Sequence, residues 1–148
     1  MPTLSPSTEA CEAIRNRINS GTDYALEVRA EVRDEITEDL KDLRQLRVDV
    51  CQESEEQLFE TIDLQDNTSH QIRVWIRKKL DTTTQDELEQ LKLLRRQIEL
   101  RLLNYATDDW RVRIWDVSNT QAPLMERDMF HQDRSFVVSI LCRVEVKP

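Results

Sequence analysis

The chain has 148 residues, of which 39% are hydrophobic and 34% are charged, and its formal net charge at pH 7 is −8. This length suits one domain with one core, and the high charged fraction suits a thin, two-layer fold with a large surface. The net negative charge argues against sequence-independent binding to nucleic acid, because such binding depends on clustered lysine and arginine.

Residues that usually carry chemistry are few. The chain has a single glycine, which excludes the glycine-rich loops that cradle phosphates. Cys11, Cys51 and Cys142 are widely spaced and form no CxxC pair, so we expect reduced thiols and folding in a cytoplasm. His70 and His131 have no metal ligand at a suitable spacing, so no metal site and no cofactor is predicted. We expect a protein that is not an enzyme, although a pair of carboxylates that meet only in space stays open.

The N-terminal elements are predicted to be a short helix and a strand. After a flexible arm over residues 1–6, Ser7 can cap a helix that ends near Asn19, and Gly21 is placed to close it in a left-handed conformation. Apolar and charged residues then alternate over residues 24–33, which predicts a half-buried strand. A helix is the alternative there, because glutamate and arginine are good helix formers.

The middle of the chain predicts further strands. Residues 36–43 are interpreted as a short helical or irregular connection, and the alternation over residues 46–51 predicts a strand. Residues 53–56 are then expected to form a solvated acidic loop. Residues 57–64 and 69–78 predict a hairpin across a polar turn.

The clearest helix opens at Thr84, which stands at capping-box spacing from Glu87. One side of this helix is apolar and comprises Leu88, Leu91, Leu94, Ile98 and Leu102. Additional leucines widen that stripe, namely Leu93, Leu100 and Leu103. They indicate either a wide core face or a second contact with a neighbouring subunit, and both alternatives stay open.

The C-terminal part predicts two strands separated by a long loop. Residues 110–115 alternate, and residues 135–146 form a final strand that is apolar on both faces at its start. The loop spans residues 118–134. Together the elements predict a single α+β domain over residues 1–148, with a largely antiparallel or mixed sheet of about five strands packed by one long helix and a short N-terminal helix.

The candidate interface residues are apolar side chains outside the predicted core rows. Trp75 and Trp115 share strand faces with arginines, which is typical of an interface; the alternative is that the long helix covers this second face. The long loop is more apolar than a solvated loop needs to be, because it contains Leu124, Met125, Met129 and Phe130. It could act as a docking arm or fold over its own core.

The order of elements resembles that of a known family. After the short helix come the segments LRVDVCQESEEQLFETID, SHQIRVWIRKKLDTTTQDELEQLKLLRRQIELRLL and SFVVSILCRVEV. This order is similar to that of the tail-terminator and tail-completion (head–tail neck) proteins of long-tailed bacteriophages, over most of residues 13–146. The resemblance implies a structural virion protein that forms a ring at the end of the tail tube or at the head-to-tail neck. Such a ring would terminate tail growth and join the tail to the head.

The resemblance also implies partners. These would be other copies of the chain, commonly as a hexamer, together with the tail tube protein and neck or connector proteins. DNA would pass through without specific binding, no membrane would be involved, and the protein would be located in the virion after assembly in the host cytoplasm. The rival hypothesis is a monomeric acidic binding or inhibitor-type module, with a patch comprising Glu53, Glu55, Glu56 and Asp63.

Overall fold

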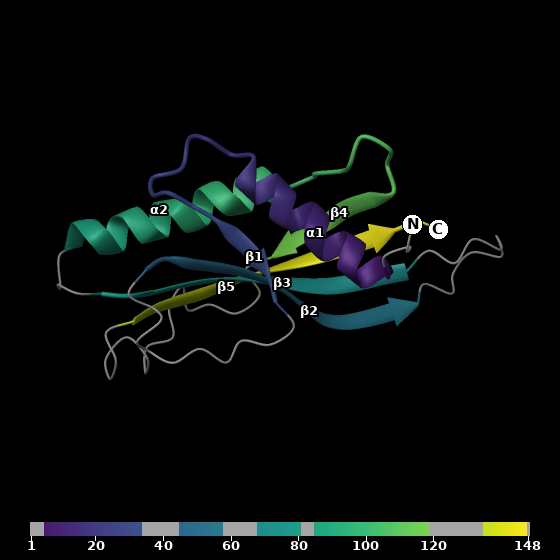
Figure 1. The fold of residues 1–148 in the computed structure, drawn as a ribbon, viewed down its shortest axis with the longest axis horizontal. Helices are drawn as coiled ribbons and strands as arrows, with labels where there is room; N and C mark the ends of the chain where they lie inside the picture. The colour runs from purple at the N-terminus through teal and green to yellow at the C-terminus, as the bar shows by residue number, and fades with distance from the viewer. Residues whose placement is uncertain (1–4, 34–44, 58–67, 81–84, 119–134, 148) are drawn as a thin grey trace.

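The computed structural model describes residues 5–33, 45–57, 68–80, 85–118 and 135–147 (Figure 1). The elements of these residues are α1 (Pro6–Asn19), β1 (Ala30–Val32), β2 (Arg47–Gln57), β3 (Thr68–Lys79), α2 (Gln85–Leu102), β4 (Val112–Ser118) and β5 (Ser135–Val146). The strands form one sheet in the order β1-β2-β3-β5-β4. The β1–β2 pair is parallel and the other pairs are antiparallel. The predicted α+β class with a mixed sheet and two helices is confirmed in the part of the chain that the structure describes.

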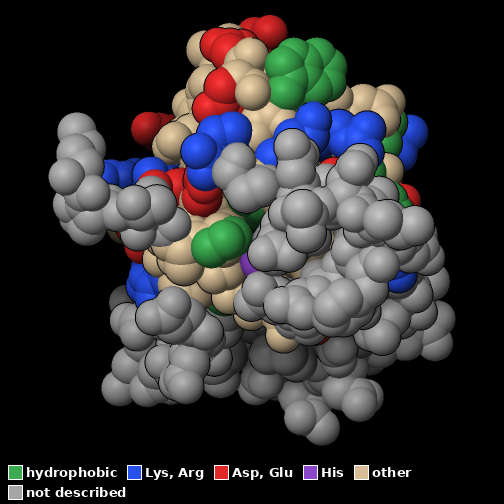
Figure 2. All heavy atoms as spheres, turned by 90° about the vertical axis from the view of Figure 1, so that its right-hand side faces the viewer, with side chains coloured by type: hydrophobic (Ala, Val, Ile, Leu, Met, Phe, Trp, Pro, Cys, Tyr) green, Lys and Arg blue, Asp and Glu red, His purple; other side chains and the backbone are tan. Residues whose placement is uncertain are grey.

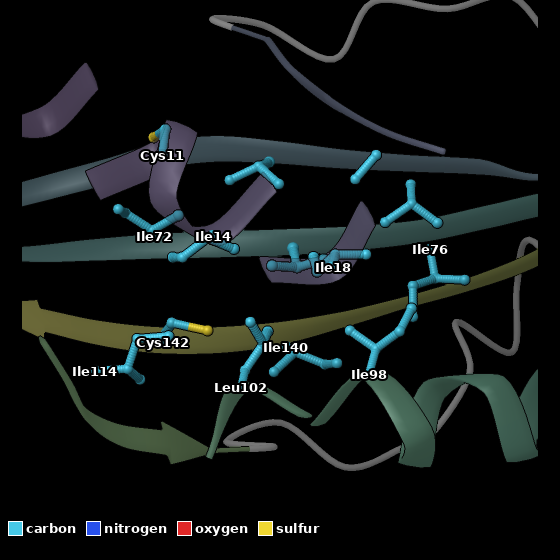
Figure 3. Close-up of a cluster of buried hydrophobic side chains, with 14 of the residues drawn as sticks. Cys11, Ile14, Ile18, Ile72, Ile76, Ile98, Leu102, Ile114, Ile140 and Cys142 are labelled. Carbon is cyan, nitrogen blue, oxygen red and sulfur yellow. The ribbon is translucent and has the colours of Figure 1, made fainter. Parts of the chain in front are cut away.

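Both helices lie on the same face of the sheet, and the core fills the space between the two layers (Figure 1). Figure 3 shows Ile14 of α1 next to Ile72 of β3, and Ile98 of α2 near Ile140 of β5. All four side chains are fully buried. This layer follows from the sequence periods, because alternate strand residues face one side of a sheet while residues three and four apart share one side of a helix.

The first helix begins earlier than predicted. Ser5, not Ser7, is its N-cap, since the Ser5 hydroxyl accepts a hydrogen bond from the Thr8 N–H at 3.3 Å. Pro6 occupies the first helical position, where its missing N–H is not needed and its fixed φ favours a helix. The arm predicted over residues 1–6 is therefore too long by Ser5 and Pro6, and residues 1–4 lie outside the described part.

The single glycine has a different role from the predicted one. Gly21 does not adopt a positive φ, and α1 ends through Ser20 in a right-handed conformation. The ring of Tyr24 packs so closely that a Cβ atom on Gly21 would lie 2.5 Å from the ring carbon Cζ. The Tyr24 hydroxyl donates a hydrogen bond to the carbonyl oxygen of Ile18 at 2.7 Å. A side chain at position 21 would therefore displace the Tyr24 ring and disturb its hydrogen bond to Ile18.

The first strand is shorter than the alternation predicted. Only Ala30–Val32 pair in the sheet, although Leu26 and Val28 pack against the core. The side-chain amide of Asn19 donates to the carbonyl oxygen of Ala30 at 3.1 Å and accepts from the Ala30 N–H at 2.7 Å. A short edge strand whose backbone is capped in this way is less open to pairing with another chain.

Strand β2 continues where an acidic loop was predicted. Residues 53–56 belong to β2, which pairs with β3 as far as Gln57 opposite Thr68. The second arm of the predicted hairpin, residues 69–78, is confirmed as β3, but the first arm is misplaced, because β3 pairs with residues 47–57 on one edge and with β5 on the other. Pairing with a neighbouring strand overrides the weak strand propensity of glutamate in this segment.

Some predicted features lie outside the described residues. These are the connection over residues 36–43, the cap Thr84, and the long loop from residue 119 to residue 134. That loop includes His131 and four of the candidate interface residues, Leu124, Met125, Met129 and Phe130. Ser118, predicted as the first loop residue, is the last residue of β4.

Candidate interaction surfaces

The reactive side chains of the described residues are packed into the protein. Cys11, Cys51 and Cys142 are all buried, and burial raises the pKa of the Cys142 thiol to about 12, which keeps it protonated and unreactive. His70 is fully buried on β3. Among the described residues, no three histidine, cysteine, aspartate or glutamate side chains gather as they would around a metal ion. No described helix is long and apolar enough to cross a membrane.

Helix α2 is apolar on two opposite sides. Its inner side is fully buried and comprises Leu91, Leu94, Ile98 and Leu102. On its outer side Leu93, Leu100 and Leu103 are 52%, 52% and 48% exposed, and the exposed Arg96 lies between them in sequence. Alternate steps of three and four residues keep these four side chains on one helix face. We call them the outer leucine face. The alternative of a wide core face is therefore wrong for these leucines.

The strand tryptophans lie beside arginines, as the sequence pattern predicted. The Arg73 guanidinium lies 5.8 Å from the centroid of the half-buried Trp75 ring, and Arg143 lies 5.7 Å from that of Trp115. Trp75 projects from the sheet face opposite the helices, because it alternates with the core residues of β3. The alternative that the long helix covers Trp75 is wrong, since α2 packs on the other face. Trp115 remains 44% exposed and is the more available of the two.

A buried ion cluster lies next to Trp75. Asp49 is 1% exposed, and its carboxylate contacts Arg77 at 2.5 Å and Arg33 at 2.9 Å. Asp49 stands directly opposite Trp75 in the register of β2 and β3. Removing one member of such a cluster leaves a buried charge without compensation, so the group stabilises the protein only when complete. We assign it to the junction of β1, β2 and β3.

A recess of about 400 Å³ opens between α1 and the turn that leads into β4. Its lining includes Tyr105 and the acidic residues Glu9, Glu12, Asp108 and Asp109. Asp109 accepts hydrogen bonds from the Thr107 hydroxyl at 2.6 Å and the Arg111 N–H at 3.1 Å. These bonds, the one from Thr107 first, hold the pKa of Asp109 below its ordinary value, so this carboxylate is charged at neutral pH.

Glu9 differs from the other acidic residues of the recess, because its carboxylate forms an ion pair with Arg111 at 3.0 Å. The negative charge that the recess offers to a partner therefore comes mainly from Glu12, Asp108 and Asp109.

Trp110 stands on the turn beside this recess. It was predicted inside a strand, which is wrong: its φ is 60°, its side chain is 62% exposed, and its N–H donates to the Thr107 carbonyl oxygen at 2.9 Å. The consecutive aspartates before Trp110 are the sequence signal for this turn, because aspartate bonds to nearby backbone N–H groups. At the top of the view in Figure 2, a hydrophobic side chain lies beside acidic ones, above a band of lysine and arginine.

The acidic patch of the rival hypothesis is partly neutralised. The Glu53 carboxylate receives two hydrogen bonds from Arg73, at 3.1 and 3.0 Å. The side chains of Glu55, Glu56 and Asp63 lie outside the described residues. Among the described residues, the acidic surface whose charge is available to a partner is instead the recess beside Trp110.

The fold and these surfaces define a small α+β protein whose outer leucine face, Trp110 turn and Trp115 present apolar groups to solvent. A scan against models of protein families finds no match to this chain, and a search of curated proteins finds none.

Proposed function

We propose that the chain is a structural protein that assembles with copies of itself. The outer leucine face carries this proposal, because Leu93 and Leu100 of α2, and Leu103 directly after it, are each about half exposed, whereas the other side of α2 already forms the core. Single exposed leucines are ordinary, whereas apolar side chains that gather on one helix face, here on either side of Arg96, indicate an interaction site. Covering the exposed halves of three leucines would stabilise an assembly by roughly 2–4 kcal/mol.

The specific form of the proposal is a ring at the end of a phage tail tube or at the head-to-tail neck. The resemblance in element order supports it, and so does the net charge of −8, because a channel through which DNA slides should not be strongly basic. The ring would end tail growth and present a surface for joining the head. Its partners would be the tail tube protein and neck or connector proteins, within the virion.

A second candidate function is a monomeric acidic binding module. The acidic recess beside Trp110 favours it, since carboxylates next to an exposed aromatic ring suit a basic partner. In this case the recess would bind a foreign protein, and the outer leucine face would stay in solvent.

The mass of the purified chain in solution separates the two candidates. Light scattering or native mass spectrometry should give a multiple of the mass of one chain, and electron microscopy should show rings that bind isolated tail tubes. A monomer at high concentration that binds no tail tube would refute the ring.

A further inference from the structure

We propose that the outer leucine face of one copy docks against the acidic recess and Trp110 turn of the next copy. This inference rests on the self-assembly proposed above and names the surface that meets α2. It joins the half-exposed leucines and Arg96 on one side with Glu12, Asp108 and Trp110 on the other.

The position of Arg96 argues against pairing between two copies of α2. An antiparallel two-fold pairing that places Leu93 opposite the other copy's Leu100 has its axis between residues 96 and 97. The two Arg96 side chains would then meet in the centre of an apolar contact. A parallel two-fold pairing also sets Arg96 against Arg96, and like charges placed together in an interface cost several kcal/mol. A surface that offers negative charge between apolar groups therefore suits the outer leucine face better than a second copy of α2 in these two arrangements.

The recess beside Trp110 has this composition. Glu12 and Asp108 supply carboxylates, and the partly exposed Ala13 and Tyr105 supply apolar surface. A guanidinium can bind a carboxylate through two parallel hydrogen bonds and can also stack on an aromatic ring, which a lysine does less well. Arg96 is available to a partner, because its side chain is 60% exposed and its 3.5 Å ion pair with Glu99 lies near the surface, where such pairs contribute little.

The Trp110 turn is fixed in place before any partner binds. Arg111 ties the turn to α1 through Glu9 at 3.0 Å, and its carbonyl oxygen accepts a hydrogen bond from the Lys147 N–H at 2.8 Å. The positive φ of Trp110 is unfavourable for a bulky residue, yet the ring gains little burial within its own chain. A rigidly presented aromatic side chain loses little conformational entropy on docking, which favours association.

Contact between two different surfaces has a consequence for symmetry. Each copy would use its outer leucine face toward one neighbour and its recess toward the other. Such heterologous contacts build a closed ring when the rotation closes, and a filament when it does not. The inference is therefore compatible with a ring and incompatible with a simple two-fold dimer through α2.

Charge reversal on each surface tests the pairing. Arg96→Glu and Asp108→Arg each bring like charges together at every contact, so each variant alone should associate at least about tenfold more weakly than the wild type. Matched controls are Arg29→Glu and Glu27→Arg, which reverse the charge of other exposed side chains. Circular dichroism checks that all variants are folded, and analytical ultracentrifugation measures association.

Mixing the two variants gives the decisive result. The Arg96→Glu chain meets the Asp108→Arg chain through a new Glu–Arg contact, and the reverse contact is the original one. An equimolar mixture should therefore assemble about as well as the wild type, and the controls should assemble like the wild type throughout.

Two outcomes would overturn the inference in distinguishable ways. In the first, the wild type assembles, but Asp108→Arg has no effect or the mixture of variants does not assemble. This result would show that the recess does not bind α2, and it would not contradict the ring proposal. A wild type that stays monomeric refutes the proposed assembly itself.

Discussion

Truncation of two residues of α2 that lie two positions apart should lower stability by very different amounts. Ile98 is fully buried against the sheet, whereas Leu100 is 52% exposed on the outer leucine face. Ile98→Ala should lower the free energy of unfolding by about 2–5 kcal/mol, because it removes core contacts and leaves a cavity. Leu100→Ala should lower that of the unassembled chain by about 1 kcal/mol or less, since half of the side chain is already in water.

The order of the two effects should be reversed in an association assay, where Leu100→Ala should have the larger effect. Leu100→Ala removes apolar area that a neighbouring subunit would cover, so the dissociation constant should rise roughly tenfold. Urea unfolding at low protein concentration measures the first quantity, because assembly adds concentration-dependent stability, and ultracentrifugation at high concentration measures the second. The reasoning would be refuted if Leu100→Ala destabilised the dilute chain as much as Ile98→Ala, or if it left association unchanged.

Asp49→Asn should lower the free energy of unfolding by about 3–5 kcal/mol in urea, because it removes the buried charge that Arg77 and Arg33 both contact. Glu31→Gln is the control on the exposed side of the same cluster and should cost about 1 kcal/mol or less, so equal losses would contradict a buried role for Asp49. Gly21→Ala should destabilise the protein by about 1–3 kcal/mol, because the added Cβ clashes with the Tyr24 ring. In a double-mutant cycle, the same substitution should cost much less in a Tyr24→Ala background, and an equal cost there would assign the loss to the backbone. Burial first and the Asp116 charge second raise the pKa of Cys142 from 9.0 to about 12, so its contribution to stability is constant below pH 9 and declines as the pH rises toward 12. Ellman's reagent at pH 8 should therefore label Cys142 only after the chain unfolds. Rapid labelling of the folded chain would show that the thiol is accessible.

The alternation of apolar residues was the most reliable sequence signal. It located the rows of β3 and β5 because each strand has one face against the helices, and burial of one face fixes the period. It located the first half of β2 but ended the strand too early, because the acidic second half has no strand pattern and is held by its long pairing with β3. It also overestimated β1, where alternation continues into a segment packed on the core without strand pairing.

The surfaces were only partly predictable. The additional leucines on α2 and the arginine neighbours of Trp75 and Trp115 are visible in the sequence, because helix and strand periods place them away from the core rows. The recess beside Trp110 was not predicted. It joins α1 to a turn about one hundred residues later, and no local pattern connects those segments.

The sequence alone determined the α+β class, the two helices and the core rows, because these depend on local periodicity and on the burial of apolar side chains. Only the tertiary structure decided which apolar side chains remain exposed to solvent. The sheet has room for one side of α2, so Leu91 and Ile98 are buried while Leu93 and Leu100 face solvent. The pairing order of the strands, the need for glycine under Tyr24 and the acidic recess likewise depend on contacts between residues far apart in the chain or folded back on one another, which periodicity does not encode.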